Sequence, residues 1–290
     1  MDELILAMKH YIAFALFLLF PALSLLAQHD SIAFTSAQWE TKAVAEGITL
    51  KHYHFTNAGL FKSNQNINIL DIKLNPGTSI AFGYEPKLLK PTSEYGKAAD
   101  AIAAINGTFF DVKNGGSVDY LKVNDSVIST NHLWANNTRA RHQRAALVLH
   151  KGRLRICKWD GTKHWETKLH AKDVMLSGPL LLYHRQVEAL DTSEFNHARH
   201  PRSAIAVLGK KHVLLITVDG RNENAAGMSL FELTKILQWL HAKDGLNLDG
   251  GGSTTLWLRN LGVVNYPTDN KKWDHEGERK VASTVLIKRK

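Results

Sequence analysis

Apolar residues recur along the chain at intervals that distinguish strands from helices. Residues 66–74, NINILDIKL, alternate between apolar and polar side chains as a half-buried strand does, and residues 101–110, AIAAINGTFF, form an apolar run that ends in a loop. Residues 144–159 and 202–221 each contain two apolar runs around a short turn, at Lys151–Gly152 and at Gly209–Lys211. Both stretches therefore predict β-hairpins.

A single segment has the spacing of an amphipathic helix. Apolar residues recur every three or four positions from Leu230 to Leu240, and Ser229 with Glu232 forms the capping box that begins many helices. The apolar stripe of such a helix needs a partner surface. The pattern therefore predicts a helix that covers one face of a sheet.

The predicted helix connects two strands that both end in an aspartate. The second strand of the hairpin at 202–221 is followed by Asp219, and the strand at 246–248 is followed by Asp249. Strands joined by a helical crossover can lie parallel, which places both acids at one edge of the sheet, where ligands gather. The rest of the chain is hairpin-rich, so the sequence predicts an α+β fold with a mixed β-sheet and few helices.

The chain shows no internal repeat, long linker or low-complexity tract after its first 27 residues. We therefore expect a single domain over residues 61–290 with an N-terminal lead-in over 28–60. Residues 12–27 form an apolar run that is short for a membrane span and contains Pro21, as is typical of a secretory signal peptide over 1–27. Asp2 and Glu3 weaken the basic start of a signal peptide and leave an uncleaved anchor as the alternative.

Composition narrows the class of protein. The 290 residues are 44% hydrophobic and 22% charged, which fits a globular chain and excludes disorder. Cys157 is the single cysteine, and an exported protein without an intramolecular disulfide indicates a bacterial envelope, periplasmic or secreted. The net charge of 36 − 27 = +9 is scattered, so it favours acidic ligands or reflects a solvated basic surface.

Two classes of partner are not expected. The sequence contains no zinc, haem or nucleic-acid signature, so we expect no nucleic-acid partner. No segment after the first 27 residues is long and apolar enough to cross a bilayer, so we expect no stable membrane insertion once a signal peptide is removed.

The stretch GLNLDGGGSTTLWL, residues 245–258, places three glycines between an acid and a strand. A glycine run in an ordered core is costly unless something must approach the backbone closely. The backbone N–H groups of Gly250, Gly251 and Gly252, with the hydroxyl of Ser253 behind them, are suited to hold an anion such as phosphate. A tight turn between two strands is the alternative.

Four polar clusters border the predicted strands: INGTFFD, LSGPLLL, HPRSAIA followed by VDGR, and LDGGGST. In this order they resemble the phosphodiester glycosidase family, whose best-known members remove N-acetylglucosamine from a sugar phosphodiester. The resemblance covers residues 60–290 and is strongest after His200. Thr108, Ser203 and Ala206 depart from the family's commoner Gly, Thr and Gly, and the cysteine-rich additions of the animal enzymes are absent.

The resemblance implies an exported hydrolase that cleaves the C1–O bond of a sugar-1-phosphodiester, either GlcNAc-1-phosphodiester-like or derived from a cell wall or polysaccharide. Asp249, Asp219 and Asp111 are the candidate carboxylates, and His200 is a candidate for proton transfer. Arg202 and Arg221 would hold phosphate oxygens in bidentate fashion. The candidate substrate-binding residues are Asn106, Arg202, Arg221, Gly250, Gly251, Gly252, Ser253 and Arg279.

Most of these residues also have a structural interpretation. Asp219 and Asp111 could serve as turn residues, and Asn106 as a buried amide that holds a loop. Plain ion pairing would account for His200, for Arg202 and for Arg279 at the surface equally well.

Two other functions stay open. The three carboxylates together would suit a possible divalent cation, Ca²⁺ or Mg²⁺, and hence a metal-dependent phosphodiesterase. A non-catalytic envelope protein could instead bind glycans through tryptophan side chains. The tryptophans concerned are Trp134, Trp159, Trp257 and Trp273.

Overall fold

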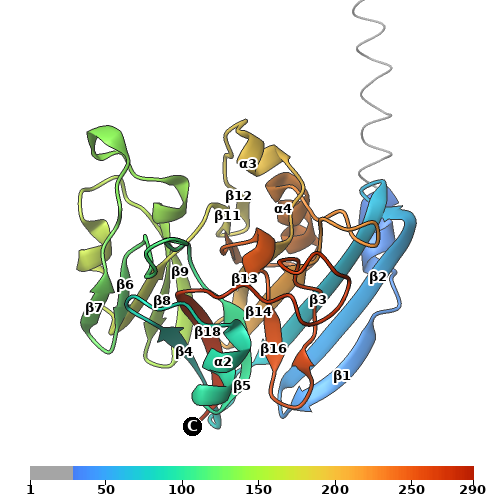
Figure 1. Cartoon of the computed structure of the whole chain (residues 1–290), viewed down its shortest axis with the longest axis horizontal. Coiled ribbons are helices and arrows are strands. Elements are labelled where there is room, and N and C mark those ends of the chain that lie inside the picture. Colours follow the sequence, from blue (N-terminus) through green and yellow to red (C-terminus); the bar gives the residue numbers. More distant parts are fainter. Residues whose placement is uncertain (1–28) are drawn as a thin grey trace, which may run out of the picture.

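The computed structural model describes residues 29–290, and the predicted signal peptide with its cleavage site lies outside the described residues (Figure 1). Residues 29–35 are helical and lead into the first strand. Within the described part of the chain, no helix combines the length and the apolar character that a membrane span requires.

The largest element is an eight-stranded sheet. Every pairing between its strands is antiparallel. In spatial order its strands are β1 (Glu40–Ala45), β2 (Ile48–Leu60), β3 (Ser63–Lys73), β14 (His212–Val218), β13 (Arg202–Gly209), β15 (Asp244–Asn247), β11 (Leu180–Tyr183) and β12 (Gln186–Val187).

Two five-stranded sheets complete the β-structure and lie beside the large sheet (Figure 1). One contains β7 (Ser126–Ser129), β6 (Leu121–Val123), β10 (Asp173–Leu176), β8 (Ala145–His150) and β9 (Arg153–Lys158). The other contains β17 (Gly262–Val263), β16 (Leu256–Leu258), β5 (Ala101–Asn106), β18 (Ser283–Arg289) and β4 (Thr78–Tyr84).

Helices are short and few among the described residues. The α-helices with defined bounds are α2 (Thr92–Ala98), α3 (Glu194–His197) and α4 (Leu230–Trp239). The 3₁₀ turns are η1 (Ala135–Asn137), η2 (Arg141–Gln143), η3 (Trp165–Lys168) and η4 (Gly251–Ser253). The predicted α+β, hairpin-rich fold with few helices is therefore confirmed.

The large sheet is buried on both faces because its central strands are apolar on both sides. Ile205 of β13 and Leu215 of β14 join a core that extends to the two smaller sheets. Their neighbours Ala204 and Ile216 face the opposite core, which is covered by α4. Strands enclosed in this way read as continuous apolar runs, as residues 203–208 and 213–218 do.

The local predictions are confirmed where they depend on neighbouring residues. β8 pairs with β9 and β13 with β14 as hairpins around the expected turns. α4 begins with the expected capping box, in which the Ser229 hydroxyl accepts a bond from the Glu232 N–H and the Glu232 carboxylate accepts one from the Ser229 N–H. Leu230, Leu233, Ile236 and Leu237 are buried.

Residues 40–60 have a larger role than a lead-in. β1 and β2 form the outer strands of the large sheet, and β2 pairs with β3 from Ile48 opposite Ile72 to Phe55 opposite Gln65. The sheet therefore begins about twenty residues before the boundary expected at residue 61. The alternation of apolar and polar residues in β2 is weak because this strand is half-exposed over much of its length.

Candidate active site

The two strands that end in aspartate run in the same direction. β14 and β15 are both antiparallel to β13, which lies between them, so they run in the same direction within a sheet whose described pairs are all antiparallel, where the sequence predicted a mixed sheet. Asp219 directly follows β14, Asp249 lies two residues beyond β15, and His200 lies two residues before β13. This edge of the sheet is the candidate active site.

Asp249 is held in place through its main chain. Its N–H donates to the Gly107 carbonyl at 3.0 Å, and its own carbonyl accepts a bond from the Asn106 side-chain amide at 2.6 Å. The carboxylate Oδ1 accepts the Gly250 N–H at 2.9 Å. Burial raises the pKa of Asp249 to about 6, against the opposing influence of nearby donors and of the charges on Arg279 and His142.

The three glycines are required by close neighbours of the turn. A Cβ on Gly250 would lie 2.7 Å from the Pro201 carbonyl oxygen. Gly251 has φ +61°, and a Cβ there would lie 3.0 Å from the Arg221 guanidinium. A side chain on Gly252 would overlap the ion pair between Asp269 and Arg279. The glycines thus allow two guanidinium groups to lie directly against the turn.

The turn does not present the row of free amides that the sequence suggested. The N–H of Gly250 donates to Asp249, that of Gly251 to the Pro201 carbonyl at 2.8 Å, and that of Ser253 to the Gly250 carbonyl at 3.2 Å. The Ser253 side chain is fully buried. The amides of Gly250 and Gly251 are thus engaged inside the protein, while no bond is formed by the Gly252 N–H among the described residues, so the arginines are the main candidates for anion binding at this edge.

Arg221 and Arg279 differ in their freedom to bind an anion. Arg221 is exposed, has φ 60°, and forms no ion pair with an acid in residues 29–290; its Nη2 lies 3.5 Å from Nδ1 of His200. Arg279 donates two bonds of 2.8 Å to Asp269, and this pairing raises the pKa of its guanidinium. Arg221 is therefore the freer cation.

Arg202 does not have the environment of a bidentate phosphate clamp. It is only 2% exposed, and its Nε donates to the Met228 carbonyl while Nη2 donates to the carbonyls of Phe195 and Ala198, all at 2.9 Å. Burial lowers the pKa of Arg202 to about 10. Most of this fork holds backbone carbonyls, so the structure favours a structural role for Arg202 over the phosphate clamp that the sequence suggested.

Asp219 and Asn106 are fully buried and hold loops together. Asp219 accepts bonds from the Asn66 amide at 2.8 Å and from the Asn265 amide and the Tyr266 N–H at 2.9 Å, and burial raises its pKa. Asn106 accepts the Ser203 hydroxyl at 2.6 Å in addition to donating to Asp249. Both residues hold the loops of the site through buried hydrogen bonds, which agrees with the structural role that the sequence allowed for them.

The three carboxylates that the sequence left open as metal ligands do not form a cluster in the described residues. Asp111 accepts bonds from the N–H groups of Lys113 and Asn114, and these bonds with the Asn114 amide lower its pKa. It therefore caps a turn. Within residues 29–290, no group of three His, Cys, Asp or Glu side chains is placed to hold a metal ion. The donor set does not fit a Ca²⁺ or Mg²⁺ centre built from Asp111, Asp219 and Asp249.

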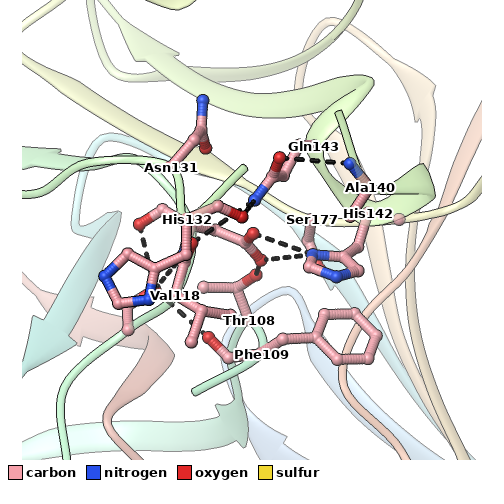
Figure 2. Close-up of polar contacts among 12 residues, drawn as sticks. Thr108, Phe109, Val118, Asn131, His132, Ala140, His142, Gln143 and Ser177 are labelled. Atoms are coloured by element: carbon pink, nitrogen blue, oxygen red, sulfur yellow. Dashed lines mark hydrogen bonds and ion pairs between the residues drawn. The ribbon is translucent and has the colours of Figure 1, made fainter. Parts of the chain in front are cut away.

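The structure adds a histidine and a carboxylate that were not singled out from the sequence. Nδ1 of His142 lies 2.8 Å and 2.9 Å from the two oxygens of Asp119, and the Thr108 hydroxyl donates to Asp119 at 2.7 Å (Figure 2). The Phe109 ring stacks on the imidazole, with centroids 4.3 Å apart. Gly178 permits this packing, because a Cβ there would lie 3.1 Å from the His142 Cα.

His142 lies beside the end of β15. Gly178, on which it packs, accepts a bond from the Asn247 amide, and Asn247 is the last residue of that strand. A sequence signal for this histidine exists, because ARHQRAALVL (140–149) is similar to ARHPRSAIAV (198–207). In both places a histidine lies just before the first strand of a hairpin.

The fold and the site together define a β-rich domain in which a carboxylate and cations meet at one sheet edge. The family model for phosphodiester glycosidases matches residues 99–288. The chain therefore belongs to the phosphodiester glycosidase family, and the resemblance found in the sequence is confirmed.

Individual relatives agree with this assignment. Over 86 residues the chain is 35% identical to N-acetylglucosamine-1-phosphodiester alpha-N-acetylglucosaminidase from Bos taurus, a match covering 29% of this chain and 16% of the bovine protein. The catalytic domain of the zebrafish enzyme of the same name, auto-inhibited by its pro-peptide, has a similar fold, with TM-score 0.63, 17% identity and coverage of 91% of this chain and 92% of that one. A hypothetical protein from Synechocystis has TM-score 0.62 and 18% identity, covering 87% of this chain and 64% of the other.

Proposed function

We propose that this protein is an exported hydrolase that cleaves the C1–O bond of a sugar-1-phosphodiester. The observation that carries the proposal is the position of Arg221 beside the glycine turn that begins at Asp249. An exposed guanidinium without an acidic partner in the described residues is suited to a phosphate oxygen. A carboxylate on the same turn is suited to the positive charge that develops at C1.

The two groups divide the chemistry of the reaction. The leaving phosphate needs cations to orient it and balance its charge, which we assign to Arg221 with support from Arg279. The anomeric carbon gains oxocarbenium character as the C1–O bond breaks, and the negative charge of Asp249 stabilises that state. The names of the bovine and zebrafish relatives make N-acetylglucosamine-1-phosphodiesters the first substrates to test. Cell-wall and polysaccharide fragments with the same linkage come next.

The alternatives receive less support. A phosphodiesterase that uses a carboxylate-bound metal needs a ligand set that residues 29–290 do not bring together. A glycan-binding surface needs exposed aromatic rings in one place, whereas Trp257 is 4% exposed in the core and Trp134 is 57% exposed in a loop before η1.

The test is hydrolysis of a synthetic N-acetylglucosamine-1-phosphodiester in ¹⁸O-labelled water by the purified protein. We expect the label to appear in the released sugar, because water attacks C1. Label in the phosphate would show P–O cleavage and reject the proposed reaction. Absence of turnover across a panel of sugars and aglycones would reject enzymatic activity on this linkage.

Export is the second part of the proposal and rests on residues 12–27 of the sequence. We expect the mature chain to begin near Gln28 and to be recovered from the envelope or the medium. Intact-mass measurement of the fractionated protein decides this point. A full-length mass in the membrane pellet would favour the uncleaved anchor.

A further inference from the structure

We propose that His142 is the general base that activates water in the reaction proposed above, with Asp119 as the residue that positions it. The inference rests on the proposed function and assigns a role to a pair that the sequence motifs do not contain. Three observations carry it: the geometry at Nδ1, the free Nε2, and the place of His142 by the end of β15, a strand that ends two residues before Asp249.

The bond to Asp119 fixes the state of the imidazole. Asp119 is fully buried, and both of its oxygens lie within 2.9 Å of Nδ1 of His142. A carboxylate accepts hydrogen bonds, so Nδ1 carries the proton and Nε2 has a free lone pair in the neutral ring. The same carboxylate stabilises the imidazolium that forms when Nε2 takes a proton.

The carboxylate is itself held in one orientation. The Thr108 hydroxyl donates to Oδ2 of Asp119 at 2.7 Å, and Thr108 is 1% exposed. Phe109 fixes the ring plane by stacking on it. An imidazole held on two sides is preorganised for proton transfer.

Nε2 is available to water or substrate. It forms no hydrogen bond with any residue from 29 to 290, while the side chain of His142 is 17% exposed. The backbone of His142 packs against Gly178, whose carbonyl accepts a bond from Asn247 at the end of β15, and Asp249 follows two residues later. The base precedes β8 of one sheet and the charge-stabilising carboxylate follows β15 of another, and both lie by the same end of β15.

The step balances as a hydrolysis. An O–H bond of water breaks and its proton moves to Nε2 of His142, while the water oxygen forms a bond to C1. The bond between C1 and the phosphate oxygen breaks, and its electron pair leaves with the phosphate. The imidazolium then releases its proton to solvent. The phosphate leaves as an anion, so the histidine is needed at water rather than at the leaving group.

The test uses His142→Asn, because the Asn side chain can still donate to Asp119 but has no group at the position of Nε2. We expect kcat to fall on the order of 100-fold or more with a similar KM. Azide is a nucleophile that needs no deprotonation, so it should restore turnover and yield the sugar azide. His132→Gln is the matched control, since this exposed histidine forms no side-chain hydrogen bond within the described residues, and it should keep wild-type turnover.

Each result of this experiment has a defined meaning. Near-normal kcat in folded His142→Asn overturns the inference while the proposed function stands. A loss of turnover that azide does not rescue assigns the imidazole another role and also overturns it. Asp119→Asn should lower kcat at least about tenfold with the same azide rescue. A wild-type protein that does not cleave C1–O removes the proposed function, and the inference with it.

Discussion

Two hairpins of similar local sequence flank the end of β15, and they place their histidines in opposite electrostatic environments. His142 precedes the β8–β9 hairpin and faces the buried carboxylate of Asp119. His200 precedes the β13–β14 hairpin, where burial and the charges of Arg202 and Arg221 lower its pKa. A carboxylate therefore faces the imidazole of His142, whereas positive charges face the imidazole of His200 and disfavour its protonated form. In our proposal the tripeptide ARH at 140–142 provides a histidine for proton transfer. The same tripeptide at 198–200 provides a histidine whose neutral form is favoured.

The arginines two residues after these histidines show the same divergence. Arg144 is exposed and lies over the Trp159 ring at 5.8 Å. Arg202 is enclosed, and its fork holds three backbone carbonyls of the loops around α3 and α4. The surroundings decide the role in each case, because the residues that bind or bury these groups come from distant parts of the chain.

The largest expected effect is at Asp249, which both histidine segments flank. Asp249→Asn keeps the size of the side chain and one acceptor oxygen but removes the charge, so we expect kcat to fall by roughly 30- to 1000-fold, or about 2–4 kcal/mol. Steady-state kinetics on the phosphodiester measure the loss. Asp160→Asn, at an exposed turn, is the control and should leave kcat unchanged. Near-normal turnover in folded Asp249→Asn would remove this residue from the catalytic group.

The comparison of the two arginines is tested by stability. Arg202→Lys loses most of a buried fork of three charged hydrogen bonds, so we expect the free energy of unfolding to fall by about 2–4 kcal/mol. The matched change Arg144→Lys at the exposed site should cost less than about 1 kcal/mol. Denaturant unfolding measures both variants. A stable Arg202→Lys protein with a raised KM would restore the phosphate-clamp interpretation that the sequence first suggested.

Arg221 carries the phosphate in our proposal, so its removal should act on affinity. Arg221→Gln takes away one charged contact, and we expect KM to rise by about 10- to 100-fold while kcat changes little. Arg153→Gln removes an exposed arginine of β9 and should change neither constant. If Arg221→Gln lowers kcat at unchanged KM, the guanidinium acts on the transition state instead of holding the ground-state phosphate.

Much of the fold could be predicted because its signals are local. The hairpin turns, the capping box of α4 and the run from strand to glycine turn each depend on residues within a few positions of one another. The position of Asp219 and Asp249 at one edge of the sheet could also be predicted, because Asp219 follows a strand and is joined through a helix to the second strand, which Asp249 follows. The weakly patterned β1 and β2 were missed because β1 is a largely exposed edge strand and β2 is only partly buried over much of its length.

Residue roles at the site could not be predicted to the same depth. Asp219 and Asp249 are both acids after a strand, yet three donors from residues 66, 265 and 266 turn the first into a support for loops. His142 meets Asp119 across 23 positions of loop and strand. Such pairings depend on tertiary packing, which a short motif does not encode.

The smallest expected effect concerns the pH dependence of stability and again uses Asp249. Its pKa of about 6 in the folded protein exceeds the ordinary value of 3.8, so the folded state binds more protons than the unfolded state between these values. This contribution to stability is fully present below about pH 4 and is lost as the pH rises through about 6. Because the side chain is partly exposed, we expect about 1–2 kcal/mol rather than the full shift.

Asp249→Asn isolates this contribution, because Asp219 has a raised pKa of the same sign in both proteins and cancels in the difference. The free energy of unfolding of the variant relative to wild type should therefore increase by about 1–2 kcal/mol from pH 4 to pH 7. Parallel urea titrations at the two pH values measure it. A difference that does not change with pH would show that the Asp249 carboxylate is solvated like an ordinary surface acid. The proposed role of Asp249 as a buried carboxylate that stabilises charge, in contrast to His142 as a base held by Asp119, would then lose its support.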